Sequence, residues 1–158
     1  MRPTSVAVLA LATLSVMSAA PAGADNTRLN NSVVAGMYTV RHQAGCAEPD
    51  IAPNRPLALA AQRHARDLVN HPEVNGDIGS DGSTPETRSA ATGFIGSVSE
   101  TVAINPALAI NNLDVITQWY RDPAALAIMS DCANTAIGVW SENSLSRSVV
   151  VAVYGRPV

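Results

Sequence analysis

Apolar residues in the first part of the chain recur at three- and four-residue steps, which is the spacing of an amphipathic helix. One such stripe predicts a helix over residues 27–42 and is formed by Leu29, Val33, Met37 and Val40. A second helix is predicted over residues 55–70, because Asn54 is a suitable N-cap and Pro56 falls in the first turn, where a missing N–H costs nothing. The inner face of this second helix is apolar apart from one imidazole, His64.

Three shorter helical segments follow. The residues Ser83-Thr84-Pro85-Glu86 match a capping box, which predicts that a short helix starts there and ends near Gly93. Apolar and aromatic residues at helical spacing over 113–120 predict a further helix that ends before Asp122-Pro123. Residues 124–129 are expected to add one more helical turn.

The last third of the chain changes its pattern. Residues 136–140 and 148–154 are rich in β-branched side chains, and a polar turn over 141–146 separates them, which predicts a β-hairpin. A further extended piece is expected within 94–104. Helices followed by strands are typical of an α+β domain, with the helices packed on a small antiparallel sheet.

The start of the chain has the features of an export signal. A positive residue at the second position precedes an apolar run of 11 residues over 6–16, and the small residues 22–24 form an A-x-A cleavage site. A membrane span needs roughly 20 apolar residues, so the run is too short for one. We therefore expect a signal peptide over 1–24 that is cleaved before Asp25, and one mature domain over 25–158. The mature protein is expected outside the cell, either free or attached to the wall.

Charge excludes several classes of function. The chain has 10 basic residues against 13 acidic ones, a net charge of −3, which does not favour binding to nucleic acid or anionic lipid. All of the basic residues are arginines. The absence of lysine excludes a Schiff-base enzyme and a P-loop nucleotide site.

The chain has two cysteines, Cys46 and Cys132, which allow a single pairing. In an exported protein a disulfide is the expected state of such a pair. The cysteines lie 86 positions apart, so closing this loop contributes on the order of 4 kcal/mol in the chain-entropy model.

Five segments in this order resemble the secreted CAP superfamily, which comprises the cysteine-rich secretory proteins, antigen 5 and the pathogenesis-related proteins, in its short bacterial form. The segments are HARDL at 64–68, GSDGSTPETR at 79–88, SETVA at 99–103, WYRDPAALAIM at 119–129 and IGVW at 137–140. The resemblance implies an α-β-α sandwich with a central antiparallel sheet. It also implies a groove with two histidines and two acids, which in some members binds a divalent metal.

That groove cluster is largely replaced in this chain. The resemblance places Asp77 where the first histidine of the family usually stands, and Ala125 where the second stands. The acid of the family's Gly-Glu-Asn motif is matched by Glu100, and Asp122 stands where longer members have another acid. These four residues are our candidates for a ligand-binding groove. A zinc site usually includes at least one imidazole or thiolate, so we expect neither a metal nor another cofactor.

The histidines that remain are poorly placed for a metal site. His64 lies on the apolar stripe of its helix, and we expect it to be a hydrogen-bonded core residue. His42 and His71 stand at helix ends, where capping or solvent exposure is expected.

We therefore predict a secreted, non-catalytic domain that binds a small lipid-like molecule, an envelope component or a protein partner through its groove or surface. The alternative is a metal-independent cell-envelope hydrolase, in which Asp77 and Glu100 act as paired carboxylates with help from Asp122. Against this alternative, Asp77 is also suited to a turn, and Glu100 to accepting hydrogen bonds from the backbone or from an arginine. A scaffold protein with an empty groove is a third interpretation.

Overall fold

The structure is a computed structural model that describes residues 23–48, 50–106 and 110–158. Most of the predicted signal peptide lies outside these residues. The helices are α1 (Gly23–Gln43), α2 (Arg55–Asn70), α3 (Pro85–Ala91), α4 (Asn112–Arg121) and α5 (Pro123–Met129). The strands are β1 (Ala52–Pro53), β2 (Gly96–Asn105), β3 (Ala136–Asn143) and β4 (Ser148–Pro157). Among the described residues, no helix is both long enough and apolar enough to cross a bilayer.

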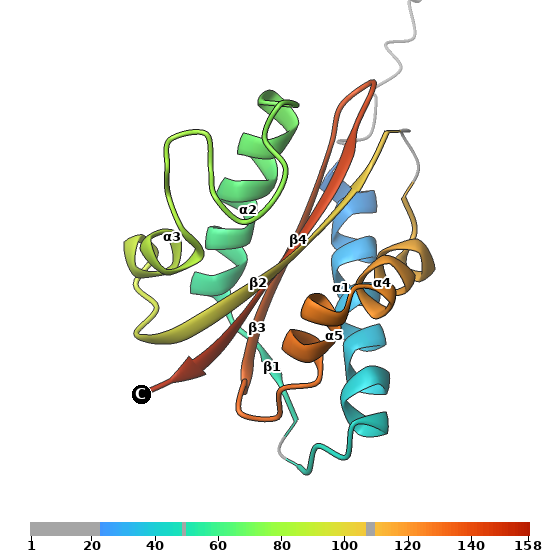
Figure 1. Ribbon diagram of the computed structural model, residues 1–158, viewed down its shortest axis with the longest axis vertical. Coiled ribbons are helices and arrows are strands. Elements are labelled where there is room, and N and C mark those ends of the chain that lie inside the picture. The colour runs from blue at the N-terminus through green and yellow to red at the C-terminus, as the bar shows by residue number, and fades with distance from the viewer. Residues whose placement is uncertain (1–22, 49, 107–109) are drawn as a thin grey trace, which may run out of the picture.

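The strands form one sheet in the order β1-β3-β4-β2, with helices on both faces (Figure 1). Helices α2 and α3 cover one face, and α1, α4 and α5 cover the other. The predicted α+β class and the α-β-α sandwich are therefore confirmed. The sheet is antiparallel except for β1, which pairs in parallel with the start of β3. The sequence analysis missed β1 because a strand of two residues leaves no periodic pattern.

Strand β4 lies at the centre of the sandwich and is buried on both faces. Its side chains alternate between the two hydrophobic cores. Val149, Val151 and Val153 pack beneath α2, whereas Val150, Ala152 and Tyr154 pack beneath α1 and α4. A strand covered on both faces is expected to be an almost continuous apolar run, which explains why this segment has no polar alternation.

Most helix boundaries agree with the sequence analysis. Helix α2 begins after Asn54, whose side chain accepts a hydrogen bond from Leu57 N at 3.1 Å. The predicted capping box of α3 is wrong by one residue, because Thr84 is the N-cap and exchanges hydrogen bonds with Thr87. This register places Pro85 at the first helical position, where proline fits best.

The other differences are at element ends. Helix α1 starts at Gly23 rather than at 27, so the predicted cleavage point before Asp25 falls in its first turn. Strand β3 extends to Asn143, into the predicted polar turn, and leaves 144–147 between the two strands. Strand β4 begins at Ser148 as predicted and continues to Pro157.

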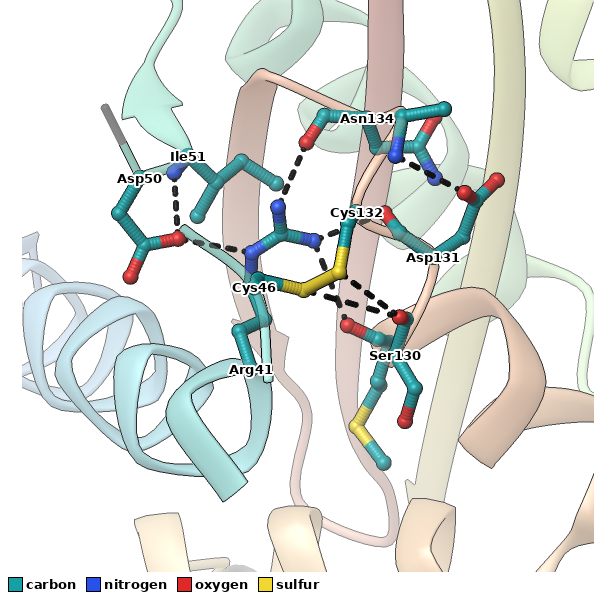
Figure 2. The surroundings of a disulfide bond; sticks show 10 residues. Arg41, Cys46, Asp50, Ile51, Ser130, Asp131, Cys132 and Asn134 are labelled. Atoms are coloured by element: carbon teal, nitrogen blue, oxygen red, sulfur yellow. Dashed lines mark hydrogen bonds and ion pairs between the residues drawn. A yellow bond between two sulfur atoms is a disulfide. The ribbon is translucent and has the colours of Figure 1, made fainter. Parts of the chain in front are cut away.

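The predicted disulfide between Cys46 and Cys132 is present and joins the end of α1 to the loop after α5 (Figure 2). Beside it, the buried guanidinium of Arg41 makes an ion pair with Asp50 at 2.8 Å. The same guanidinium donates hydrogen bonds to the carbonyl oxygens of Asp131 at 2.9 Å and Asn134 at 2.8 Å. Together the disulfide and Arg41 hold Cys46 and Asp50 against the loop after α5.

Candidate functional site

Glu100, one of the predicted groove residues, lies in the middle of β2 with its side chain fully buried against α2 and α3. One oxygen, Oε1, is 2.6 Å from Nδ1 of His64 and 2.9 Å from Nη2 of Arg88. Because an ionised carboxylate only accepts hydrogen bonds, we assign the proton on this imidazole to Nδ1. His64 is therefore a hydrogen-bonded core histidine, as predicted, and Glu100 accepts from an arginine.

Arg88 also connects this buried cluster to the loop before α3. Its Nη2 donates to the carbonyl oxygen of Asp77 at 2.7 Å, and its Nη1 donates to the carbonyl oxygen of Ser83 at 2.7 Å. Asp77 is therefore linked to Glu100 through its carbonyl oxygen and the guanidinium of Arg88. Asp77 itself is an exposed residue. The sequence analysis did not identify Arg88, although it lies inside one of the segments that resemble the family.

The other two predicted groove residues lie on the opposite face of the sheet. Asp122 is exposed and caps α5, where its Oδ1 accepts hydrogen bonds from the backbone N–H groups of Ala124 at 2.9 Å and Ala125 at 3.4 Å. The side chain of Ala125 is buried in the core with Met37 and Trp119. The structure therefore brings Glu100 near the backbone of Asp77, but it does not bring the four candidates into one groove.

A small hollow of about 230 Å³ lies beside the buried cluster and is lined by Arg63, His64, Asp67, Asp81, Ser83 and Arg88. Arg63 and Asp81 form a half-exposed ion pair at 3.0 Å. Hydrogen bonds from the hydroxyl and backbone N–H of Ser83, together with a smaller effect of Arg63, lower the pKa of Asp81 to about 2. In the part of the chain that the structure describes, no three His, Cys, Asp or Glu side chains are arranged to hold a metal ion.

His71 behaves as predicted for a histidine at a helix end. It is the C-cap of α2, and its backbone N–H donates to the carbonyl oxygen of Asp67 at 2.9 Å. Its Nδ1 is also 2.9 Å from a carboxylate oxygen of Asp67.

A larger hollow opens at the edge of the sheet where β1 ends. Strand β1 pairs only with the first two residues of β3, and the chain then turns at Asn54 into α2. Beyond Ile137, no strand among the described residues pairs with this edge of β3. The space in line with β1 is flanked by α1 and by the start of α2, and it forms a hollow of about 620 Å³.

A second hollow, of about 770 Å³, continues along the C-terminal half of α1, where Glu48 and residues 50–53 form the opposite wall. The two hollows share Tyr38 and Pro53, and we call them together the α1 groove. Its middle is apolar and is formed by Val34, Ala35, Tyr38, Pro53, Ile137 and Val139. Its ends are polar, with Asn30, Asn31 and Arg55 at one end and His42, Gln43, Glu48 and Asp50 at the other.

The sequence analysis missed the α1 groove, although one signal was available. Val34 and Tyr38 are four residues apart and therefore share one face of α1, but they lie beside the core stripe and not on it. Tyr38 is 37% exposed and Val34 is partly buried against the core, so this pair continues the apolar surface of α1 from the core toward solvent.

Comparisons with known proteins agree with the resemblance seen in the sequence and with the observed fold. Residues 34–154 match the profile of the cysteine-rich secretory protein family, CAP. No curated protein matches the chain. Among solved structures, an outer surface protein from Borrelia burgdorferi has a TM-score of 0.66 and 15% identity, over 81% of this chain and 94% of that one.

Two other solved structures are similar over most of this chain. An extracellular protein of Bacillus anthracis that contains an SCP domain has a TM-score of 0.72 and 12% identity, over 89% of this chain and 45% of that one. A cysteine-rich secretory protein of Staphylococcus aureus has a TM-score of 0.61 and 10% identity, over 83% of this chain and 39% of that one. At these identities the likeness concerns the fold alone. Since the family profile covers most of the sequence and the sandwich is the same, this chain belongs to the cysteine-rich secretory protein (CAP) family.

Proposed function

We propose that this protein is a secreted, non-catalytic binding domain that holds a lipid-like molecule with one long apolar chain in the α1 groove. The observation that carries the proposal is the order of side chains along the groove, which is apolar in its middle and polar at both ends. An amphiphile presents the same order of surfaces. The disulfide, which suits an oxidising compartment, supports secretion.

The dimensions of the groove fit such a ligand. Along α1 its lining extends from Asn30 to Gln43, a length of about 20 Å at 1.5 Å per residue. Each of the two hollows has a volume in the usual range of ligand sites. Burial of about ten methylenes contributes about 8 kcal/mol before the costs of association, which brings the expected dissociation constant to the micromolar range or weaker.

The state of Glu100 favours a binding role over hydrolysis. A general acid or base must come within hydrogen-bond distance of its substrate. The side chain of Glu100 has no exposed surface and is already hydrogen-bonded to His64 and Arg88. The carboxylate of Asp77 faces solvent and has no hydrogen bond to this cluster among the described residues. We therefore keep the hydrolase as the alternative and the lipid-binding domain as the proposal.

The test is a titration of the mature protein with a fluorescent fatty acid, using Ala35→Trp to fill the middle of the groove. Ala35 is exposed on α1, so the larger side chain is expected to leave the fold intact. The matched control is Ala127→Trp, at an exposed alanine of α5 that does not line the groove. We expect at least tenfold weaker binding for Ala35→Trp, which corresponds to about 1.4 kcal/mol of binding free energy, and unchanged binding for the control. Equal affinities, or no binding to the unaltered protein, would contradict the proposal.

A further inference from the structure

Arg147, in the turn between β3 and β4, is a buried cation without a carboxylate partner among the described residues. It is 7% exposed, and the ion pairs of that part of the chain do not include it. It donates instead to the carbonyl oxygens of Leu68 at 2.9 Å and Val74 at 3.1 Å, where α2 ends. Its shortest hydrogen bond, 2.7 Å, joins Nη2 to the side-chain oxygen of Asn75. Partial charges on these oxygens compensate the guanidinium only in part.

Asn75 is followed by Gly76, and this is the one Asn-Gly pair in the sequence. A glycine has no Cβ to hinder the approach of its backbone nitrogen to the preceding side chain. Gly76 has φ +137°, and nothing lies within 4 Å of the position that a Cβ would take. Among the described residues its N–H also donates no hydrogen bond. Within the described chain, therefore, neither a neighbouring atom near the Cβ position nor a hydrogen bond restrains this nitrogen.

The reaction open to this pair is loss of the side-chain ammonia. The backbone nitrogen of Gly76 attacks Cγ of Asn75, its proton leaves, and the tetrahedral intermediate expels ammonia to give a cyclic imide. Water then opens the ring and leaves aspartate, with the new carboxylate on Cγ, or isoaspartate, with the new carboxylate on the former backbone carbonyl carbon. In the intermediate, negative charge develops on the oxygen that Arg147 already holds at 2.7 Å. Asn75 and Gly76 are exposed, so water reaches the pair, whereas the guanidinium that holds the oxygen is itself buried. A donor already aimed at the atom where charge develops stabilises the transition state.

We propose that Asn75 is a self-modification site, where Gly76 supplies the nucleophile, Arg147 stabilises the oxyanion, and the carboxylate of the aspartate product becomes the counterion of Arg147. The product has a hydrogen bond between two opposite charges, where the starting chain has one from a charged donor to a neutral amide oxygen. The modified loop is held at a second point, because Arg88 donates to the carbonyl oxygen of Asp77. This inference is independent of the α1 groove.

The first test follows conversion of Asn75 in the folded protein at mildly alkaline pH, by intact mass and peptide mapping. The same chain unfolded in urea, with its disulfide intact, provides the reference rate. We expect the folded protein to convert at least as fast as the unfolded chain, although folding ordinarily protects an asparagine by holding its backbone. We also expect Asn75→Gln to remain unconverted at this site. A folded protein that converts an order of magnitude more slowly than the unfolded chain would overturn the proposed role of Arg147.

The second test examines the product directly and does not depend on the reaction rate. Asn75→Asp is expected to melt at a higher temperature than the unaltered protein at neutral pH, whereas Asn75→Gln is expected not to. The gain is expected to disappear in Arg147→Gln, which should also slow conversion of Asn75. If Arg147→Gln does not fold, the comparison of the two Asn75 variants still decides the counterion claim. A melting temperature of Asn75→Asp at or below that of the unaltered protein refutes it.

Discussion

Removing the charge of Glu100 is expected to destabilise the whole domain. In Glu100→Gln, the guanidinium of Arg88, 1% exposed, loses its only carboxylate partner among the described residues. Breaking a buried pair from one side typically costs about 3–5 kcal/mol. At about 3 °C per kcal/mol for a domain of this size, the melting temperature should fall by about 10 °C or more. Thermal unfolding followed by circular dichroism measures this directly.

The matched control is Glu142→Gln on β3, where Glu142 pairs with the exposed Arg66 at 3.3 Å. This change is expected to cost about 1 kcal/mol or less, because solvent screens an exposed pair. Equal melting temperatures for the two variants would refute the reasoning. The double variant Arg88→Met/Glu100→Met leaves neither charge unpaired, so it should be more stable than Glu100→Gln. It should not recover the full stability of the unaltered protein, because the hydrogen bond from Arg88 to the carbonyl oxygen of Asp77 is also lost. The hydrolase alternative predicts a different result for Glu100→Gln, namely lost activity on wall polysaccharide with an unchanged melting temperature.

Two further predictions concern acid and reducing agents. The pKa of Asp81 is lowered from 3.8 to about 2 in the folded chain, so its carboxylate stabilises the fold above pH 3.8 and loses that effect as the pH falls towards 2. The unaltered protein should therefore lose more thermal stability across that window than Asp81→Asn does. Reduction of the bond between Cys46 and Cys132 should lower the free energy of unfolding by about 4 kcal/mol in a urea titration, and no change would contradict the chain-entropy argument.

Periodic patterns predicted the secondary structure well, because they depend on local spacing. Helix α2 begins and ends where its cap and its stripe indicated, and the hairpin of β3 and β4 is present. The two-residue strand β1 is set by pairing with a distant segment and has no local pattern. The capping box failed by one residue because both Ser83 and Thr84 are suitable N-caps, and only the position of Pro85 decides between them.

The site was predicted less well, for a different reason. A resemblance fixes the order of residues along the chain, but it does not show which face of the sheet each side chain occupies. Glu100 and Ala125 matched neighbouring positions of one expected groove, yet the sheet lies between them. The partnership of Glu100 with Arg88 joins β2 to α3, and no spacing rule predicts such a pair. Only the α1 groove had a local signal, in Val34 and Tyr38.

Within the described part of the chain, the three buried arginines have a common consequence for how this molecule opens. Arg41, Arg88 and Arg147 each donate hydrogen bonds from the core to the backbone carbonyls of an irregular segment. A lysine could not replace them, because a single ammonium cannot present donors in a rigid planar fork. The loops at 74–83 and 130–134 are thus attached to the interior at several carbonyl oxygens, and wide opening of either loop requires these hydrogen bonds to break. Proteolytic cleavage within them would accordingly report the global unfolding equilibrium of the domain, and not the local fraying that surface loops usually show.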